Sequence, residues 1–160
     1  MTPVYRIGFC PTPAPPAPAL LAFLGYGSTL GNGRWHTQGP LQVVYCGSSR
    51  ALCQLEKRVH SNGANPKGQA LMRLEIPDSG PLDDVANLGL PGDWRADEAA
   101  TQAIGDAWIA STSRLGMWVP SLIEPTEKNL LLNPAHPSYS SIVLTIERHP
   151  FTFDPRLFSR

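Results

Sequence analysis

The stretch that decides the fold runs from Asn32 to His60 and reads NGRWHTQGPLQVVYCGSSRALCQLEKRVH. It opens with a glycine-containing loop and continues with an apolar run over residues 41–46, which predicts a strand. A helix is expected from about residue 48 to residue 60, with Ser48 or Ser49 as its N-cap. Loop, strand and helix therefore follow each other directly.

Three chemically distinct side chains recur in this stretch at intervals of eleven positions: Arg34, Tyr45 and Glu56. The predicted loop thus carries a guanidinium, the strand a phenol and the helix a carboxylate. Because the three elements are consecutive, one cavity could receive all three groups.

The position of Glu56 on its helix is informative. Leu52, Leu55 and Val59 recur at helical spacing and predict the stripe that faces the core. Glu56 lies only about 40° from Leu52 around the helix, within the width of such a stripe. Two basic side chains are expected to project away from the core: Lys57 and Arg58. A carboxylate on a buried face is costly unless its charge is satisfied, so Glu56 is either a functional acid or half of a structural ion pair.

Composition indicates one domain covering residues 1–160, with 42% apolar residues and a formal net charge of zero. The charge balance argues against a broad electrostatic surface for nucleic acid or an anionic membrane. Cys10, Cys46 and Cys53 show no CxxC spacing and are expected to be small core residues in a reducing compartment. The apolar run over residues 19–24 is too short to span a bilayer. We therefore expect a soluble cytoplasmic protein.

The N-terminal third holds a second arginine and an unusual loop. A strand is expected at Val4–Ile7, with Arg6 pointing either outward or inward. Residues 11–30 are rich in proline and glycine and are expected to form a variable loop or insertion. The glycines just before Arg34 could shape a pocket wall.

The remaining elements complete an α+β pattern. Gln69–Ile76 alternates as a half-buried strand, and a helix over residues 96–110 contains Gly105, which could let another element pack closely. The strand expected over 117–123 contains Pro120, which should lie at an edge or a bulge. Two further strands are expected at residues 130–133 and 141–146, followed by a tail at 151–158 whose aromatic rings dock on the core. The prediction is a compact α+β domain of short mixed strands with a few helices.

If Arg34, Tyr45, Glu56 and Ser121 share a cavity, they suit a dinucleotide. A guanidinium binds phosphate oxygens through paired hydrogen bonds, and an aromatic ring offers a flat surface to a base. A partly desolvated glutamate stabilises positive charge on a sugar carbon as a glycosidic bond breaks. Arg6 is available as a second cation.

Three alternatives remain open from the residues. A metal site would have to use four histidines that show neither metal-ligand spacing nor a cysteine partner: His36, His60, His136 and His149. An RNase toxin could use His36 or His136 with Arg34, although the neutral charge balance weighs against it. A non-catalytic binding module could use the cavity and the proline-rich loop to recognise a partner.

The order of several short motifs over most of the chain resembles the RES domain, the toxin component of bacterial RES–Xre toxin–antitoxin pairs. The motifs are Tyr5-Arg6-Ile7, Gly33-Arg34-Trp35, Val43-Val44-Tyr45, Leu55-Glu56, Val119-Pro120-Ser121 and Leu132-Asn133-Pro134. The resemblance implies a fold similar to ADP-ribosyltransferase toxins. It also implies an Xre-type antitoxin as partner, and NAD+ as substrate with no separate cofactor.

By the same resemblance, Arg34 and Arg6 would hold the diphosphate or ribose, and Tyr45 would position the nicotinamide ribose. Glu56 would stabilise the oxocarbenium-like transition state. Further substrate contacts, or support for the groups above, would come from Trp35, Ser121 and Asn133. The acceptor of the ADP-ribose remains open among water, phosphate and a host protein.

Overall fold

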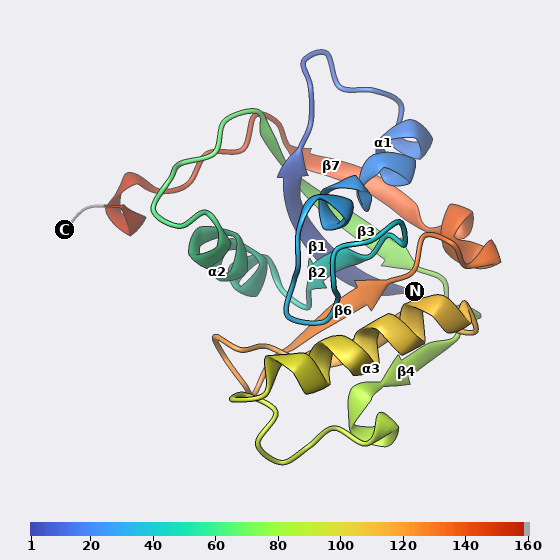
Figure 1. Cartoon of the computed structure of the whole chain (residues 1–160). Helices are drawn as coiled ribbons and strands as arrows, with labels where there is room; N and C mark the ends of the chain where they lie inside the picture. The colour runs from blue at the N-terminus through green and yellow to red at the C-terminus, as the bar shows by residue number, and fades with distance from the viewer. Residues whose placement is uncertain (159–160) are drawn as a thin grey trace.

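The computed structural model describes residues 1–158 and has the predicted α+β architecture (Figure 1). Seven strands form one sheet in the order β4-β5-β6-β2-β1-β3-β7, and all neighbours are antiparallel except β4 and β5. The strands are β1 (Thr2–Phe9), β2 (Val44–Gly47), β3 (Gln69–Ile76), β4 (Leu82–Asp84), β5 (Gly116–Pro120), β6 (Lys128–Leu132) and β7 (Val143–Arg148). The α-helices are α1 (Ala17–Phe23), α2 (Arg50–His60) and α3 (Glu98–Ser111). Short 3-10 helices cover Tyr26–Leu30, Val85–Leu88, Pro137–Ser141 and Pro155–Leu157.

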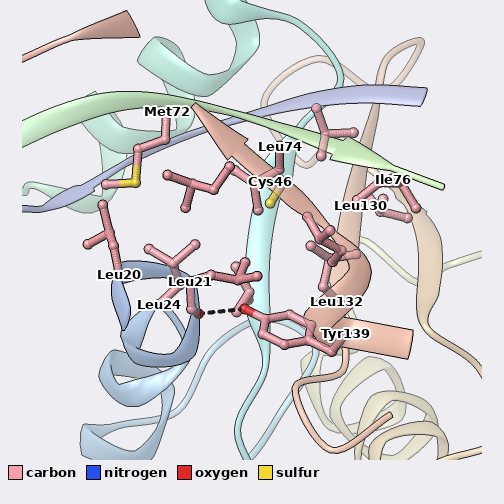
Figure 2. Close-up of a cluster of buried hydrophobic side chains, with 14 of the residues drawn as sticks. Leu20, Leu21, Leu24, Cys46, Met72, Leu74, Ile76, Leu130, Leu132 and Tyr139 are labelled. Atoms are coloured by element: carbon pink, nitrogen blue, oxygen red, sulfur yellow. Dashed lines mark hydrogen bonds between the residues drawn. The ribbon is translucent and has the colours of Figure 1, made fainter. Parts of the chain in front are cut away.

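Helix α1 packs on one face of the sheet and extends the core beyond the sequence prediction. Leu20, Leu21 and Leu24 are buried against β2, β3, β6 and β7 (Figure 2). The Tyr139 hydroxyl donates to the Leu21 carbonyl at 2.9 Å and ties the helix to the segment before β7. Residues 17–23 are therefore a core helix rather than part of a loop. Pro18 lies in its first turn, where the missing N–H costs no hydrogen bond.

The opposite face is covered in two places. Under α3, a cluster gathers Trp35, Val43, Trp108, Met117 and Leu131. Beside α2, the aromatic rings of the tail pack on β1 and β3 as expected, with Phe151 and Phe153 buried and Phe158 partly buried. Strand β3 alternates as predicted from Met72 to Ile76, whereas at its start Gln69 and Leu71 on the second face are buried as well. No described helix has the length and apolar character needed to cross a membrane.

Helix α2 begins at the predicted cap, but the face that it buries differs from the predicted one. The Ser49 hydroxyl accepts the Leu52 N–H at 3.0 Å and caps the helix. Leu55 and Val59, however, are 43% and 58% exposed, so the predicted core stripe was wrong beyond Leu52. The helix instead rests on Cys53, whose backbone packs so closely on Gly47 that a Cβ at Gly47 would lie 2.8 Å from the Cys53 nitrogen. The buried face of α2 therefore runs through Leu52 and Cys53.

Other strand ends differ from the predicted ones by a few residues. Strand β2 starts at Val44 rather than at residue 41, and β5 ends at Pro120, which cannot donate to a continuing ladder. Strand β4, a parallel neighbour of β5, was not predicted at all. Its three residues are too few to show an alternating pattern.

Candidate active site

A cavity of about 430 Å³ lies where β1 and β2 separate. The two strands pair only at Tyr5 and Gly47. Helix α2 forms one wall, and the glycine-rich segment 27–36 forms the other. The turn after β5 and the start of β6 close the end. The cavity therefore receives side chains from the loop, the strand and the helix of the stretch that opened the sequence analysis.

Glu56 enters the cavity from α2 with its side chain only 19% exposed. Its Oε1 accepts two hydrogen bonds, from Ser121 Oγ at 2.8 Å and from Asn129 Nδ2 at 2.6 Å. Its Oε2 lies 3.6 Å from His60 Nε2, one turn further along the helix. Burial alone would raise the pKa of Glu56, but the interactions with His60, Asn129 and Ser121 outweigh it and hold this pKa below its ordinary value. Glu56 is therefore an ionised, half-buried carboxylate at neutral pH, with one oxygen fixed.

Tyr45 is held by its hydroxyl. His36 Nε2 lies 2.9 Å from the Ser28 carbonyl and 3.0 Å from the Gly31 carbonyl, so this nitrogen carries the proton. His36 Nδ1 then accepts the Tyr45 hydroxyl proton at 2.8 Å, while the Tyr45 oxygen accepts the Trp35 N–H at 3.2 Å. Burial raises the pKa of Tyr45 well above its ordinary value. The phenol is thus neutral and bound to protein, and its ring rather than its proton is what it can offer a ligand.

Arg34 approaches the cavity from the loop, with its side chain 14% exposed. Its Nη2 donates to the Trp94 carbonyl, and its Nη1 lies 3.6 Å from Glu98 Oε2. The guanidinium carbon also lies 5.6 Å from the centre of the Trp94 ring. Three contacts thus fix the direction of this guanidinium.

Arg6 and Lys57 form a second cationic group in the cavity. Arg6 points inward and donates to the Tyr45 carbonyl at 2.7 Å and to the Leu24 carbonyl at 3.2 Å. Within residues 1–158, neither cation has a carboxylate within 4.0 Å. Burial and then the charge of Arg6 lower the pKa of Lys57. Two neighbouring cations without a carboxylate mark this end of the cavity as a place for an anion.

The structure brings most of the predicted residues together, but not all in the expected way. Ser121 is fully buried and reaches the cavity only through Glu56, while accepting the N–H groups of residues 123 and 124. Asn133 lies outside the cavity, which corrects its predicted place among the substrate contacts. Its amide donates to the Ile109 carbonyl at 2.9 Å, and its oxygen accepts the Ala135 N–H. Trp35 lines the cavity, but the residue is only 3% exposed, and its ring stacks on Trp94 with ring centroids 6.1 Å apart.

The cavity residues that the sequence analysis did not assign to this site include His36, Lys57, His60 and Asn129. For two of them, His60 and Asn129, the sequence contained a pattern that could have indicated a place in the site. His60 follows Glu56 by one helical turn and so shares its face. Asn129 pairs with Val119 in the hairpin of β5 and β6. Because Val119 precedes Ser121 by two residues, this pairing places Asn129 close to Ser121.

Comparison with known proteins identifies the family of this chain. The model of the RES domain matches residues 3–154. The protein named toxin Res from Yersinia enterocolitica (serotype O:8 / biotype 1B) is 39% identical over 136 residues, which cover 83% of this chain and 88% of that protein. The Prs ADP-ribosylating toxin from Sphingobium sp. (strain YBL2) is 39% identical over 141 residues, covering 85% and 86%.

A solved structure shares the fold. The crystal structure of the M. tuberculosis MbcT–MbcA toxin–antitoxin complex contains a chain that superposes with a TM-score of 0.68 at 18% identity. The match covers 98% of this chain and 86% of that one. Together with the family match and the relatives, this leads to the conclusion that the chain belongs to the RES domain family.

Proposed function

We propose that this protein is the cytoplasmic toxin of a toxin–antitoxin pair and that it consumes NAD+ by cleaving the bond between nicotinamide and ribose. The observation that carries the proposal is the state of Glu56. Its carboxylate is ionised and half-buried in the cavity wall, two donors hold Oε1, and Oε2 lies 3.6 Å from His60 Nε2. Such a group stabilises positive charge on a neighbouring atom more strongly than a solvated one.

The chemistry follows from the charge changes of the reaction. As the carbon–nitrogen bond breaks, its electron pair moves to the pyridinium nitrogen, which leaves as neutral nicotinamide, and positive charge develops on the ribose ring. Glu56 Oε2, whose partner in the described chain is His60 Nε2 at 3.6 Å, would stabilise that charge and accept a hydrogen bond from a ribose hydroxyl. The ring of Tyr45 would flank the nicotinamide end.

The cations of the cavity fit the rest of the substrate. Arg6 and Lys57, which lack a carboxylate partner in the described chain, would receive the diphosphate. Arg34, fixed by Trp94 and Glu98, would contact the adjoining phosphate or ribose. Dianionic diphosphate thus meets positive charge, while the cationic pyridinium meets Glu56.

The two histidines considered for an RNase, His36 and His136, do not favour that activity. Both ring nitrogens of His36 are occupied by protein groups. His136 Nδ1 accepts the Ser138 N–H and caps the 3-10 helix Pro137–Ser141. Neither ring is placed to exchange protons with an RNA backbone in the cavity.

The relatives support the toxin assignment by their names, and one of them is named as ADP-ribosylating. We propose an Xre-type antitoxin as the partner that covers the cavity. The acceptor of the ADP-ribose would be water, phosphate or a host protein.

The test is direct. Purified protein is incubated with NAD+ labelled in its adenylate part, with and without cell extract, and free nicotinamide and label on protein are measured. Nicotinamide release is expected with extract in every case, and without extract when water is the acceptor. A labelled protein band would identify transfer to a protein, whereas free ADP-ribose or its phosphate would identify degradation. No loss of NAD+ under any of these conditions would contradict the proposal and favour a non-catalytic binding module.

A further inference from the structure

The Arg34 loop is held along one face of α3. Thr101 Oγ1 donates to the Arg34 carbonyl at 2.7 Å, and Gln102 Nε2 donates to the Gly33 carbonyl at 2.9 Å. One turn later the backbone of Trp35 lies against Gly105, where a Cβ would meet the Trp35 carbonyl oxygen at only 1.7 Å. Successive turns of one helix therefore contact successive residues of the loop.

The same helix also contacts the Arg34 side chain. Glu98, in the first turn of α3, lies 3.6 Å from Arg34 Nη1 through its Oε2. Its other oxygen accepts a hydrogen bond from Gln102 Nε2 at 3.2 Å. Helix α3 thus contacts both the backbone and the guanidinium of Arg34.

The fixed end of the loop is at Thr37. Residues 33–36 form a tight turn, because Gly33 and His36 pair as a β-bridge and the Gly33 N–H donates to the His36 carbonyl at 2.9 Å. Arg34 lies at the tip of this turn. The next residue, Thr37, donates twice to Asp106: its N–H to Oδ1 at 2.9 Å and its hydroxyl to Oδ2 at 2.7 Å. This pair fastens the base of the turn to α3.

Resting on the proposed function, we infer that Asp106 is a positioning residue for substrate binding. It does not line the cavity. It acts by fixing the base of the turn whose tip carries Arg34, so that the guanidinium meets the anionic part of the substrate without reorganisation. Without Asp106 the 33–36 turn keeps its own bridge and its bonds to Thr101 and Gln102, but it loses the fastening at its base and can shift relative to the cavity. The inference is that Asp106 governs substrate affinity more than the chemical step.

Asp106→Ala and Asp106→Asn separate this role from a general effect on the fold. Alanine removes both acceptors. Asparagine keeps one carbonyl oxygen for the Thr37 N–H, and its NH₂ can donate to the Thr37 hydroxyl oxygen. Asp93→Ala is the matched control, because it removes an exposed carboxylate that has no hydrogen bond or ion pair through its side chain in the described chain.

Two measurements are made on the full chain: kcat and KM for nicotinamide release, and hydrogen–deuterium exchange of residues 33–38. For Asp106→Ala we expect faster exchange in this segment and a KM about tenfold higher, equivalent to about 1.4 kcal/mol. We expect kcat within about twofold of the wild type. Asp106→Asn and Asp93→Ala should match the wild type in both measurements.

Unchanged exchange and KM in Asp106→Ala would overturn the inference. So would a parallel fall of kcat and Tm with no separate change in KM, because that pattern reports a structural role alone. If the wild type releases no nicotinamide, the proposed function fails. The positioning of the turn is then judged by exchange alone, with faster exchange in Asp106→Ala supporting it and unchanged exchange overturning it.

Discussion

Replacing Asn129 by alanine tests whether the donors on Glu56 set its charge state. Asn129 Nδ2 donates to Glu56 Oε1 at 2.6 Å, the shorter of the two hydrogen bonds on that oxygen. Its own oxygen is buried and has no hydrogen-bond partner within residues 1–158, so truncation breaks no other side-chain hydrogen bond there. The substitution therefore removes one donor from a carboxylate and little else.

The size of the effect follows from the burial of the pair. A hydrogen bond to a charged group contributes about 1.5–3 kcal/mol, and 1.36 kcal/mol corresponds to one pH unit of proton affinity. Because the Glu56 side chain is only 19% exposed, solvent screens little of this. The ionised form is the active one and its pKa lies below the ordinary value, so activity is lost as pH falls through that pKa. In Asn129→Ala we expect the acid limb of kcat/KM to move to higher pH by about one pH unit.

The assay is the pH profile of kcat/KM for nicotinamide release. Asn87→Ala serves as the control, because Asn87 is exposed and has no hydrogen bond through its side chain in the described chain. The lowered pKa of Glu56 also predicts how folding stability changes with pH. Glu56 stabilises the fold above its unfolded-state pKa, and this contribution is lost as pH falls through the lower, folded-state pKa. The stability difference between wild type and Asn129→Ala should therefore shrink on acidification. An acid limb at the wild-type pH in an active Asn129→Ala protein would refute the reasoning.

Two further substitutions test other parts of the site. Gly105→Ala should destabilise the protein by about 3 kcal/mol or more in urea unfolding, since the new Cβ would collide with the Trp35 backbone; Gly92→Ala, with open space around it, should not, and equal values for the two would contradict the close packing. Lys57→Ala should raise KM for NAD+ about tenfold while Lys67→Ala, at an exposed position, leaves it unchanged; an unchanged KM in Lys57→Ala would remove that residue from the anion site.

The sequence patterns that proved informative were local. The cap of α2, the alternation of β3 and the close approach at Gly105 each depend on a few neighbouring residues, and the structure has them all. The recurrence of Arg34, Tyr45 and Glu56 also led to the cavity, because consecutive elements lie next to each other in space.

What could not be predicted depends on where elements lie relative to the sheet. Leu55 and Val59 have helical core spacing, but α2 buries Leu52 and Cys53 instead, and Leu55 and Val59 stay exposed. Lys57, which the sequence pattern directed away from the core, lines the cavity. Helix α1 was hidden by its prolines, which stand before it and in its first turn rather than in its interior.

The two asparagines of the β6 region show the same limit. Asn129 and Asn133 are four residues apart, so alternation along a strand would place both side chains on one face. Strand β6 ends at Leu132, however, and Asn133 turns away to bond the C-terminal end of α3. The position at which β6 ends therefore decides that Asn129 lines the cavity while Asn133 has a structural role.

The most direct test of the central claim is the rate of nicotinamide release by Glu56→Gln, measured alongside its affinity for NAD+. Glutamine keeps the size of the side chain and an oxygen for Asn129 and Ser121, but removes the negative charge. We predict a fall in kcat of about a hundredfold to a thousandfold, with NAD+ still bound by the cationic end of the cavity. Release at the wild-type rate by a folded Glu56→Gln protein would contradict the claim that this carboxylate stabilises the breaking bond.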